Sequence, residues 1–200
     1  MKGYAINILA MTLAFAVGWA AFAIKPRAVK ISAEDRRVEE YAVYSALINA
    51  LFANDETKVL IQDLTISHFF DDNKTSEADF NSRDLPSAIS SDTLDDYKVV
   101  DQHINVLTTN FVLKNNYLLL GADERKQWFQ STETIRSFHL KYPGSGSIIL
   151  LSRVGFNHKM DQALLWEWGY CGGDCGRGGF YLFRKENGVW KLKGSKIWIS

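Results

Sequence analysis

The chain has 200 residues, with 23 basic and 23 acidic side chains and a formal net charge of zero. Domains that bind nucleic acid carry an excess of Lys and Arg, so this balance argues against a nucleic-acid partner. The two cysteines and four histidines lack the spacing of a metal-binding motif, and we therefore expect no metal site and no cofactor.

The first 24 residues have the character of a membrane segment. Residues 5–24 contain no charged side chain, and about 20 helical residues span the roughly 30 Å hydrocarbon core of a bilayer. The alternative is a secretory signal peptide, cleaved after the small-x-small triplet 21–23. We expect 1–24 to be a transmembrane anchor or a signal peptide, and 25–32 to be a juxtamembrane linker.

Two signals conflict over the side of the membrane on which the domain lies. Lys25, Arg27 and Lys30 follow the apolar segment, and under the positive-inside rule they favour a cytoplasmic domain. The cleavage triplet and the cysteine pair favour export instead. We expect a single-pass membrane protein with an extracytoplasmic domain, or a secreted protein if the segment is cleaved.

The first half of the domain is predicted to be mainly helical. Apolar residues recur at helical spacing over 33–53, and Ser32 precedes them as an N-cap. The β-branched residues of 57–67 predict a strand, and the polar composition of 71–91 predicts a long loop. A second helix is predicted over about 92–112, with a strand as the alternative for its β-branched last part, 104–112.

The middle of the chain contains shorter elements. A brief apolar run covers 117–121, and a helical turn is predicted to begin at Asp123. A further helix is predicted over 131–141, because Pro143 and Gly144 stop it.

The last third is predicted to be an antiparallel meander of about four strands. Asn187 and Gly188 separate the last two apolar runs and supply the two positive-φ residues of a type I′ hairpin turn. We therefore expect residues 33–200 to form a single α+β domain, in which the helices pack on one face of this sheet. The four predicted strand segments are 147–156, 162–170, 179–186 and 189–200.

Both cysteines lie in a glycine-rich stretch, CGGDCGRGG, at 171–179. The glycines tolerate the backbone angles that a tight chain reversal over 171–178 needs. Cys171 and Cys175 are close enough in sequence to form a disulfide in an exported domain, and with Arg177 the backbone amides of the loop form a potential nest for an anion. Thiol catalysis is a weaker alternative, because the spacing is one residue longer than Cys-x-x-Cys.

Three aromatic residues alternate on the strand before this loop. Trp166, Trp168 and Tyr170 fall on one face of a strand, and Glu167 and Gly169 fall on the other. The aromatic row either packs in the core or lines an open groove for a peptide, glycan or lipid. With Arg177 nearby, these three residues are the candidate binding surface.

The C-terminal part of the chain resembles a family of bacterial proteins that carry an N-terminal signal or anchor and have no assigned activity. The resemblance rests on SRVGFN at 152–157, QALLW at 162–166, CGGDCG at 171–176 and NGVWK at 187–191. It implies an exported or membrane-anchored bacterial protein, and it implies no catalytic residue.

The function that these observations favour is binding or scaffolding, because the sequence offers no catalytic motif. The expected partners are the membrane, through the N-terminal segment, and a protein, peptide or glycan. Two enzymatic alternatives stay open. A hydrolase would need a histidine and a carboxylate brought together in one pocket by the fold, and a thiol-disulfide oxidoreductase would need a readily reduced Cys171–Cys175 bond.

Overall fold

The structure is a computed structural model and describes residues 32–53, 58–67, 89–128, 132–172 and 175–199. The predicted membrane segment 1–24 lies outside these residues, as do nearly all of the predicted linker and most of the predicted loop 71–91. Among the described residues, each helix falls short of the length or the apolar character that a membrane span requires.

The helices largely follow the sequence pattern. They are α1 (Ala33–Leu51), α3 (Ser91–Val100), α4 (Ala122–Trp128) and α5 (Thr132–Lys141). The Ser32 side chain accepts a hydrogen bond of 3.0 Å from the Asp35 amide, which confirms the predicted N-cap.

The second predicted helix is too long. It ends at Val100, and the residues that follow are irregular. The Leu107 amide donates to the Asp63 carbonyl at 2.7 Å, and the Thr65 amide donates to the Asn105 carbonyl at 2.9 Å. These tertiary hydrogen bonds hold the β-branched segment in an extended form in place of the helical turn.

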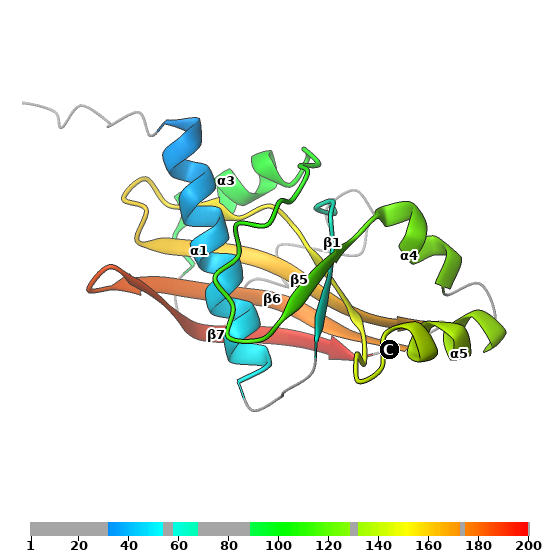
Figure 1. The fold of residues 1–200 in the computed structure, drawn as a ribbon. Coiled ribbons are helices and arrows are strands. Elements are labelled where there is room, and N and C mark those ends of the chain that lie inside the picture. The colour runs from blue at the N-terminus through cyan, green and yellow to red at the C-terminus, as the bar shows by residue number, and fades with distance from the viewer. Residues whose placement is uncertain (1–31, 54–57, 68–88, 129–131, 173–174, 200) are drawn as a thin grey trace, which may run out of the picture. The chain divides into compact units, whose positions relative to one another are not determined.

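The described strands form one mixed sheet in the order β2-β1-β3-β5-β6-β7, and a short β4 pairs with β5 (Figure 1). The chain β3-β5-β6-β7 is antiparallel throughout, which confirms the predicted meander. The sheet is nevertheless larger than predicted, because β1 pairs in parallel with both β2 and β3. The strands are β1 (Val59–Gln62), β2 (Tyr117–Leu120), β3 (Ile148–Leu151), β4 (Gly155–Phe156), β5 (Gln162–Gly172), β6 (Cys175–Glu186) and β7 (Val189–Ile199).

The turn between β6 and β7 is the one that its sequence predicts. Asn187 has φ of 51° and Gly188 has φ of 79°, and Glu186 pairs with Val189 across them. Two consecutive positive φ angles match the right-handed twist of the hairpin, which is why this turn takes Asn-Gly.

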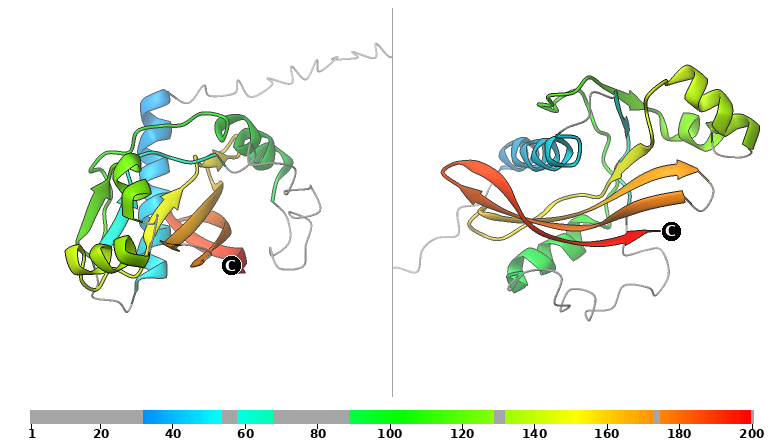
Figure 2. Two further views of the ribbon diagram at one scale, coloured as in Figure 1. Left: turned by 90° about the vertical axis from the view of Figure 1, so that its right-hand side faces the viewer. Right: turned by 90° about the horizontal axis from the view of Figure 1, so that it is seen from below.

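The helices cover both faces of the sheet, and the expectation of one covered face is wrong. Figure 2 shows α1 and α3 on opposite sides of the long strands. Successive residues of a strand point to opposite faces. Because these strands carry apolar side chains on both faces, each face has to be covered by other elements. The α1 face buries Tyr44, Leu47, Ile149, Leu165 and Phe183; the α3 cluster contains Tyr97, Leu164, Phe180 and Leu182; the α5 cluster contains Leu60, Phe138 and Ile148.

An ion pair also ties α1 to the chain after β3. Glu40, which is buried, accepts hydrogen bonds from Arg153 at 2.9 Å to Nε and 2.7 Å to Nη2. Such a pair fixes the helix position on the sheet, because removal of either partner leaves a buried charge without compensation.

Candidate functional pocket

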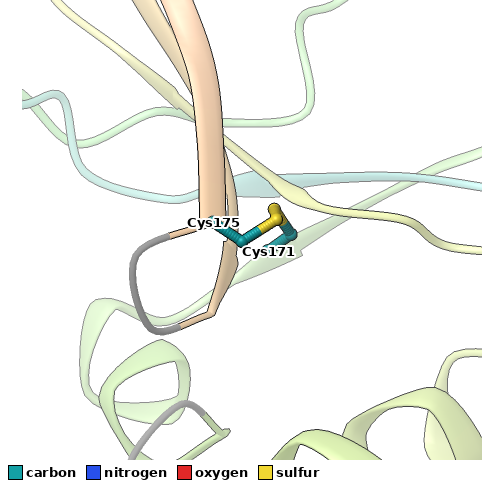
Figure 3. The surroundings of a disulfide bond; sticks show 2 residues. All are labelled: Cys171 and Cys175. Atoms are coloured by element: carbon teal, nitrogen blue, oxygen red, sulfur yellow. A yellow bond between two sulfur atoms is a disulfide. The ribbon is translucent and has the colours of Figure 1, made fainter. Parts of the chain in front are cut away.

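The hairpin of β5 and β6 ends in the predicted disulfide. The Cys171 and Cys175 side chains are joined there, with their Cα atoms 5.3 Å apart (Figure 3). The strands continue as far as Gly172 and Cys175, so the chain reversal is much shorter than the predicted 171–178.

The later glycines of the stretch lie in β6 and have a different role from the predicted one. Among the described glycines, only Gly144 and Gly188 have positive φ. A Cβ atom at Gly176 would lie 2.2 Å from the Trp168 ring, and one at Gly178 would lie 2.0 Å from the Glu167 carbonyl oxygen. These two glycines therefore make room for the neighbouring strand and its tryptophan, a requirement of space and not of backbone angle.

The aromatic row lies on the predicted face of β5 and is half-buried. The Trp166 and Trp168 rings are stacked, with centroids 5.8 Å apart and planes 2° apart. The Arg125 guanidinium lies 5.7 Å from the centre of the Tyr170 ring. Trp166 packs against the apolar cluster under α3, so the row is partly core and partly surface.

Arg177 does not belong to this row. It pairs with Gly169 across the hairpin, and directly opposed residues of two strands point to the same face of the sheet. Along β5, Gly169 points to the face opposite to Trp168 and Tyr170, and Arg177 shares the face of Gly169. The predicted surface of three aromatic residues plus Arg177 is therefore divided between the two faces of the sheet.

On the Arg177 side, the structure contains a pocket of about 460 Å³. Leu51 at the end of α1, Ile149 of β3 and Ile199 of β7 contribute apolar walls. Both cysteines line it as well, so the disulfide faces the pocket. A concave, largely apolar site with a few polar groups is the usual form of a small-molecule site.

The most deeply buried carboxyl group that lines this pocket is that of Glu167, which is only 3% exposed. Its Oε2 accepts a hydrogen bond of 3.2 Å from the Tyr181 hydroxyl. Burial raises the pKa of Glu167 to about 8, against smaller opposing effects of the Tyr181 hydrogen bond and the Arg177 charge. Burial also raises the pKa of Tyr181, and the adjacent Glu167 raises it further. At neutral pH the pocket therefore contains a protonated carboxyl group and a neutral phenol.

Gly169 keeps the space beside the carboxyl group open. A Cβ atom at this position would lie 3.5 Å from Glu167 Oε1 and 3.4 Å from Ser147 Oγ. Ser147 and Gly169 also line the pocket. Within the described residues Glu167 makes one side-chain hydrogen bond, through Oε2, which leaves Oε1 available to a ligand on this side.

Sequence reasoning placed Glu167 opposite the aromatic row but did not select it as a site residue. The available signal was the alternation Ala163, Leu165, Glu167, in which a carboxyl group occupies a register otherwise filled by buried apolar residues. Buried carboxyl groups with raised pKa values gather at functional sites. The alternation alone could not show that a pocket opens beside this position.

The histidines of the described residues do not contribute to the pocket. His103, His139 and His158 are exposed, and His158 Nδ1 lies 2.8 Å from Asp92 Oδ2 at the surface. Over the same part of the chain, no group of three or more His, Cys, Asp or Glu side chains is arranged to hold a metal ion.

Comparison of the chain with protein-family models, with curated proteins and with solved structures found no match.

Proposed function

We propose that this protein is a membrane-anchored or exported binding module whose ligand is a small molecule held in the Glu167 pocket. The observation that carries the proposal is the buried carboxyl group of Glu167 beside an apolar cavity. An acid that is neutral at pH 7 both donates and accepts hydrogen bonds, and the apolar walls favour a ligand with an apolar body.

The burial of Glu167 supports a role in binding because it is costly for folding alone. A buried carboxyl group with one hydrogen-bond partner is destabilising relative to an apolar side chain of the same size. Such a group is retained where its chemistry is needed. The apolar N-terminal segment supports the membrane-anchored or exported location, as does the disulfide on the wall of the pocket.

A pocket-filling variant tests this proposal. A Cβ atom at Gly146 would meet no atom within 4 Å, and Gly146 lines the pocket. We expect G146F to fold normally and to fill the cavity. Octanoate, octylamine and 1-octanol would be titrated calorimetrically into the full-length chain. At least one probe should bind the wild type and lose binding in G146F; if none binds, or if G146F binds equally well, the proposal fails.

The pocket suits binding better than the two enzymatic alternatives. A hydrolase of the expected kind needs a histidine next to the carboxyl group, and no histidine of the described residues lines this pocket. A thiol-disulfide oxidoreductase needs a thiolate stabilised by a helix N-terminus or a nearby cation. Cys171 and Cys175 lie on paired strands and not at a helix N-terminus. Arg177 supplies a cation in the same pocket, but the cysteine spacing is one residue longer than Cys-x-x-Cys.

The aromatic row is a second candidate binding surface, on the other face of the sheet. The parallel rings of Trp166 and Trp168 are half-exposed, and Trp198 of β7 is 37% exposed. Flat exposed indole faces stack on sugar rings and on peptide side chains. Soluble oligosaccharides and short peptides that bind here should change the tryptophan fluorescence of the wild type. If these ligands change the tryptophan fluorescence of the W198A and W168A variants as much as that of the wild type, the surface has no such role.

A further inference from the structure

We propose that the ligand of this pocket is a carboxylate with an apolar body, whose carboxylate group is held jointly by Arg177 and by the side chain of Glu167. This inference rests on the proposed function, because it names the chemical class of ligand for the same pocket. It follows from the arrangement of charge, hydrogen-bond donors and apolar walls around the cavity.

The charge of the side chains that line the pocket favours an anion over a cation. Arg177 is exposed and lines the pocket, and within the described residues it forms no ion pair. Glu167 and Tyr181 are uncharged at neutral pH, because burial raises the pKa of each. A ligand cation would meet repulsion from Arg177 and an uncharged Glu167, whereas an anion meets a charged guanidinium.

The hydrogen-bonding groups also match a carboxylate. A protonated Glu167 offers one O–H donor, and the Ser147 hydroxyl is near the same side of the cavity as Glu167 Oε1. Arg177 supplies a planar set of N–H donors that fits the two oxygens of a carboxylate. All three side chains therefore offer donors, and none of them requires a donor from the ligand.

The rest of the pocket requires an apolar body. Leu51 and Phe52 from the end of α1, Ile149 of β3 and Ile199 of β7 line it. None of these four side chains is charged or titratable. Among the described residues, the groups that titrate or carry charge next to Glu167 are Tyr181 and Arg177 on β6. A volume of about 460 Å³ lies within the range of small-molecule pockets.

The ionisation of Glu167 gives the binding a characteristic pH dependence. Above its pKa the Glu167 side chain becomes an anion and loses its donor, so it repels a ligand carboxylate. With a Glu167 pKa of about 8, the affinity for an anion should fall about 30-fold between about pH 6 and about pH 9.5. The affinity for a ligand cation would change in the opposite direction.

The test is calorimetric titration of the full-length chain with octanoate, octylamine and 1-octanol at both pH values. Octanoate should bind tightest at the lower pH and weaken about 30-fold at the higher pH. E167Q should bind octanoate with little pH dependence, because the amide does not titrate. R177Q should weaken octanoate binding by about 10-fold or more, whereas R184Q, at an exposed arginine of the same strand, should leave it unchanged.

The outcomes separate this inference from the proposed function. Octylamine binding that strengthens with pH and is lost in G146F overturns the carboxylate ligand but leaves a small-molecule pocket. Equal affinity for octanoate and 1-octanol, with no effect of R177Q, has the same consequence. Failure of all three probes to bind the wild type overturns both. Measurement of the melting temperature of each variant distinguishes lost binding from lost folding.

Discussion

Replacement of Glu167 by Gln should stabilise the protein, and the stabilisation should depend on pH. The side chain is 3% exposed, and burial raises its pKa from 4.5 to about 8 in the folded state. The unfolded chain therefore loses this proton at a lower pH than the folded protein does. Between these two pKa values, each pH unit lowers the free energy of unfolding by about 1.4 kcal/mol.

The magnitude at neutral pH follows from the same two values. Below about pH 4.5, Glu167 is protonated in both states and its ionisation costs the wild type no stability. The free energy of unfolding is lower by about 3 kcal/mol at pH 7 and by about 5 kcal/mol above pH 8. Gln stays neutral and retains an oxygen that can accept the Tyr181 hydrogen bond. E167Q should therefore match the wild type near pH 4 and exceed its stability by about 3 kcal/mol at pH 7.

Urea denaturation of the full-length chain at a series of pH values measures this difference. E186Q is the matched control: Glu186 lies at the end of the neighbouring strand β6, and hydrogen bonds from Lys193 and Lys191 lower its pKa, so it does not titrate between pH 5 and pH 8. The reasoning is refuted if the E167Q advantage is constant over that range, or if E186Q shows the same pH dependence.

Three further variants test the disulfide, the packing of α3 on the sheet and the ion pair of α1. Replacement of both Cys171 and Cys175 by Ser should lower the free energy of unfolding by about 2 kcal/mol, measured by urea denaturation, because the disulfide closes a very small loop; no change on reduction would contradict this. G155A should lower the melting temperature strongly, since its Cβ would lie 2.4 Å from the Cβ atom of Tyr97 in α3 and 2.5 Å from the Tyr97 Cα atom, and overpacking costs about 1–3 kcal/mol or more. E40Q should cost about 3–5 kcal/mol by the same measurement, because Arg153 then loses a buried anionic partner; a double variant with apolar residues at both positions should recover much of that loss.

The sequence by itself determined the features that depend on neighbours along the chain. The Ser32 cap and α1 follow from side chains within one or two helical turns. The Asn187–Gly188 turn follows from two residues that tolerate positive φ, and the disulfide follows from two cysteines four residues apart. The order of the antiparallel strands could be predicted because hairpin partners are consecutive in sequence.

The tertiary structure decided what depends on residues far apart in sequence. The parallel pairing of β1 with β2 and β3, and the cover on the second face of the sheet, have no local signal. The same holds for the pocket. Strand alternation separates Arg177 from the aromatic row and places it beside Glu167, but only the arrival of α1 and β7 encloses that carboxyl group and raises its pKa. The desolvation of a group depends on everything that packs around it. The alternation of side chains along one strand shows which face Glu167 lies on, but not how deeply it is buried.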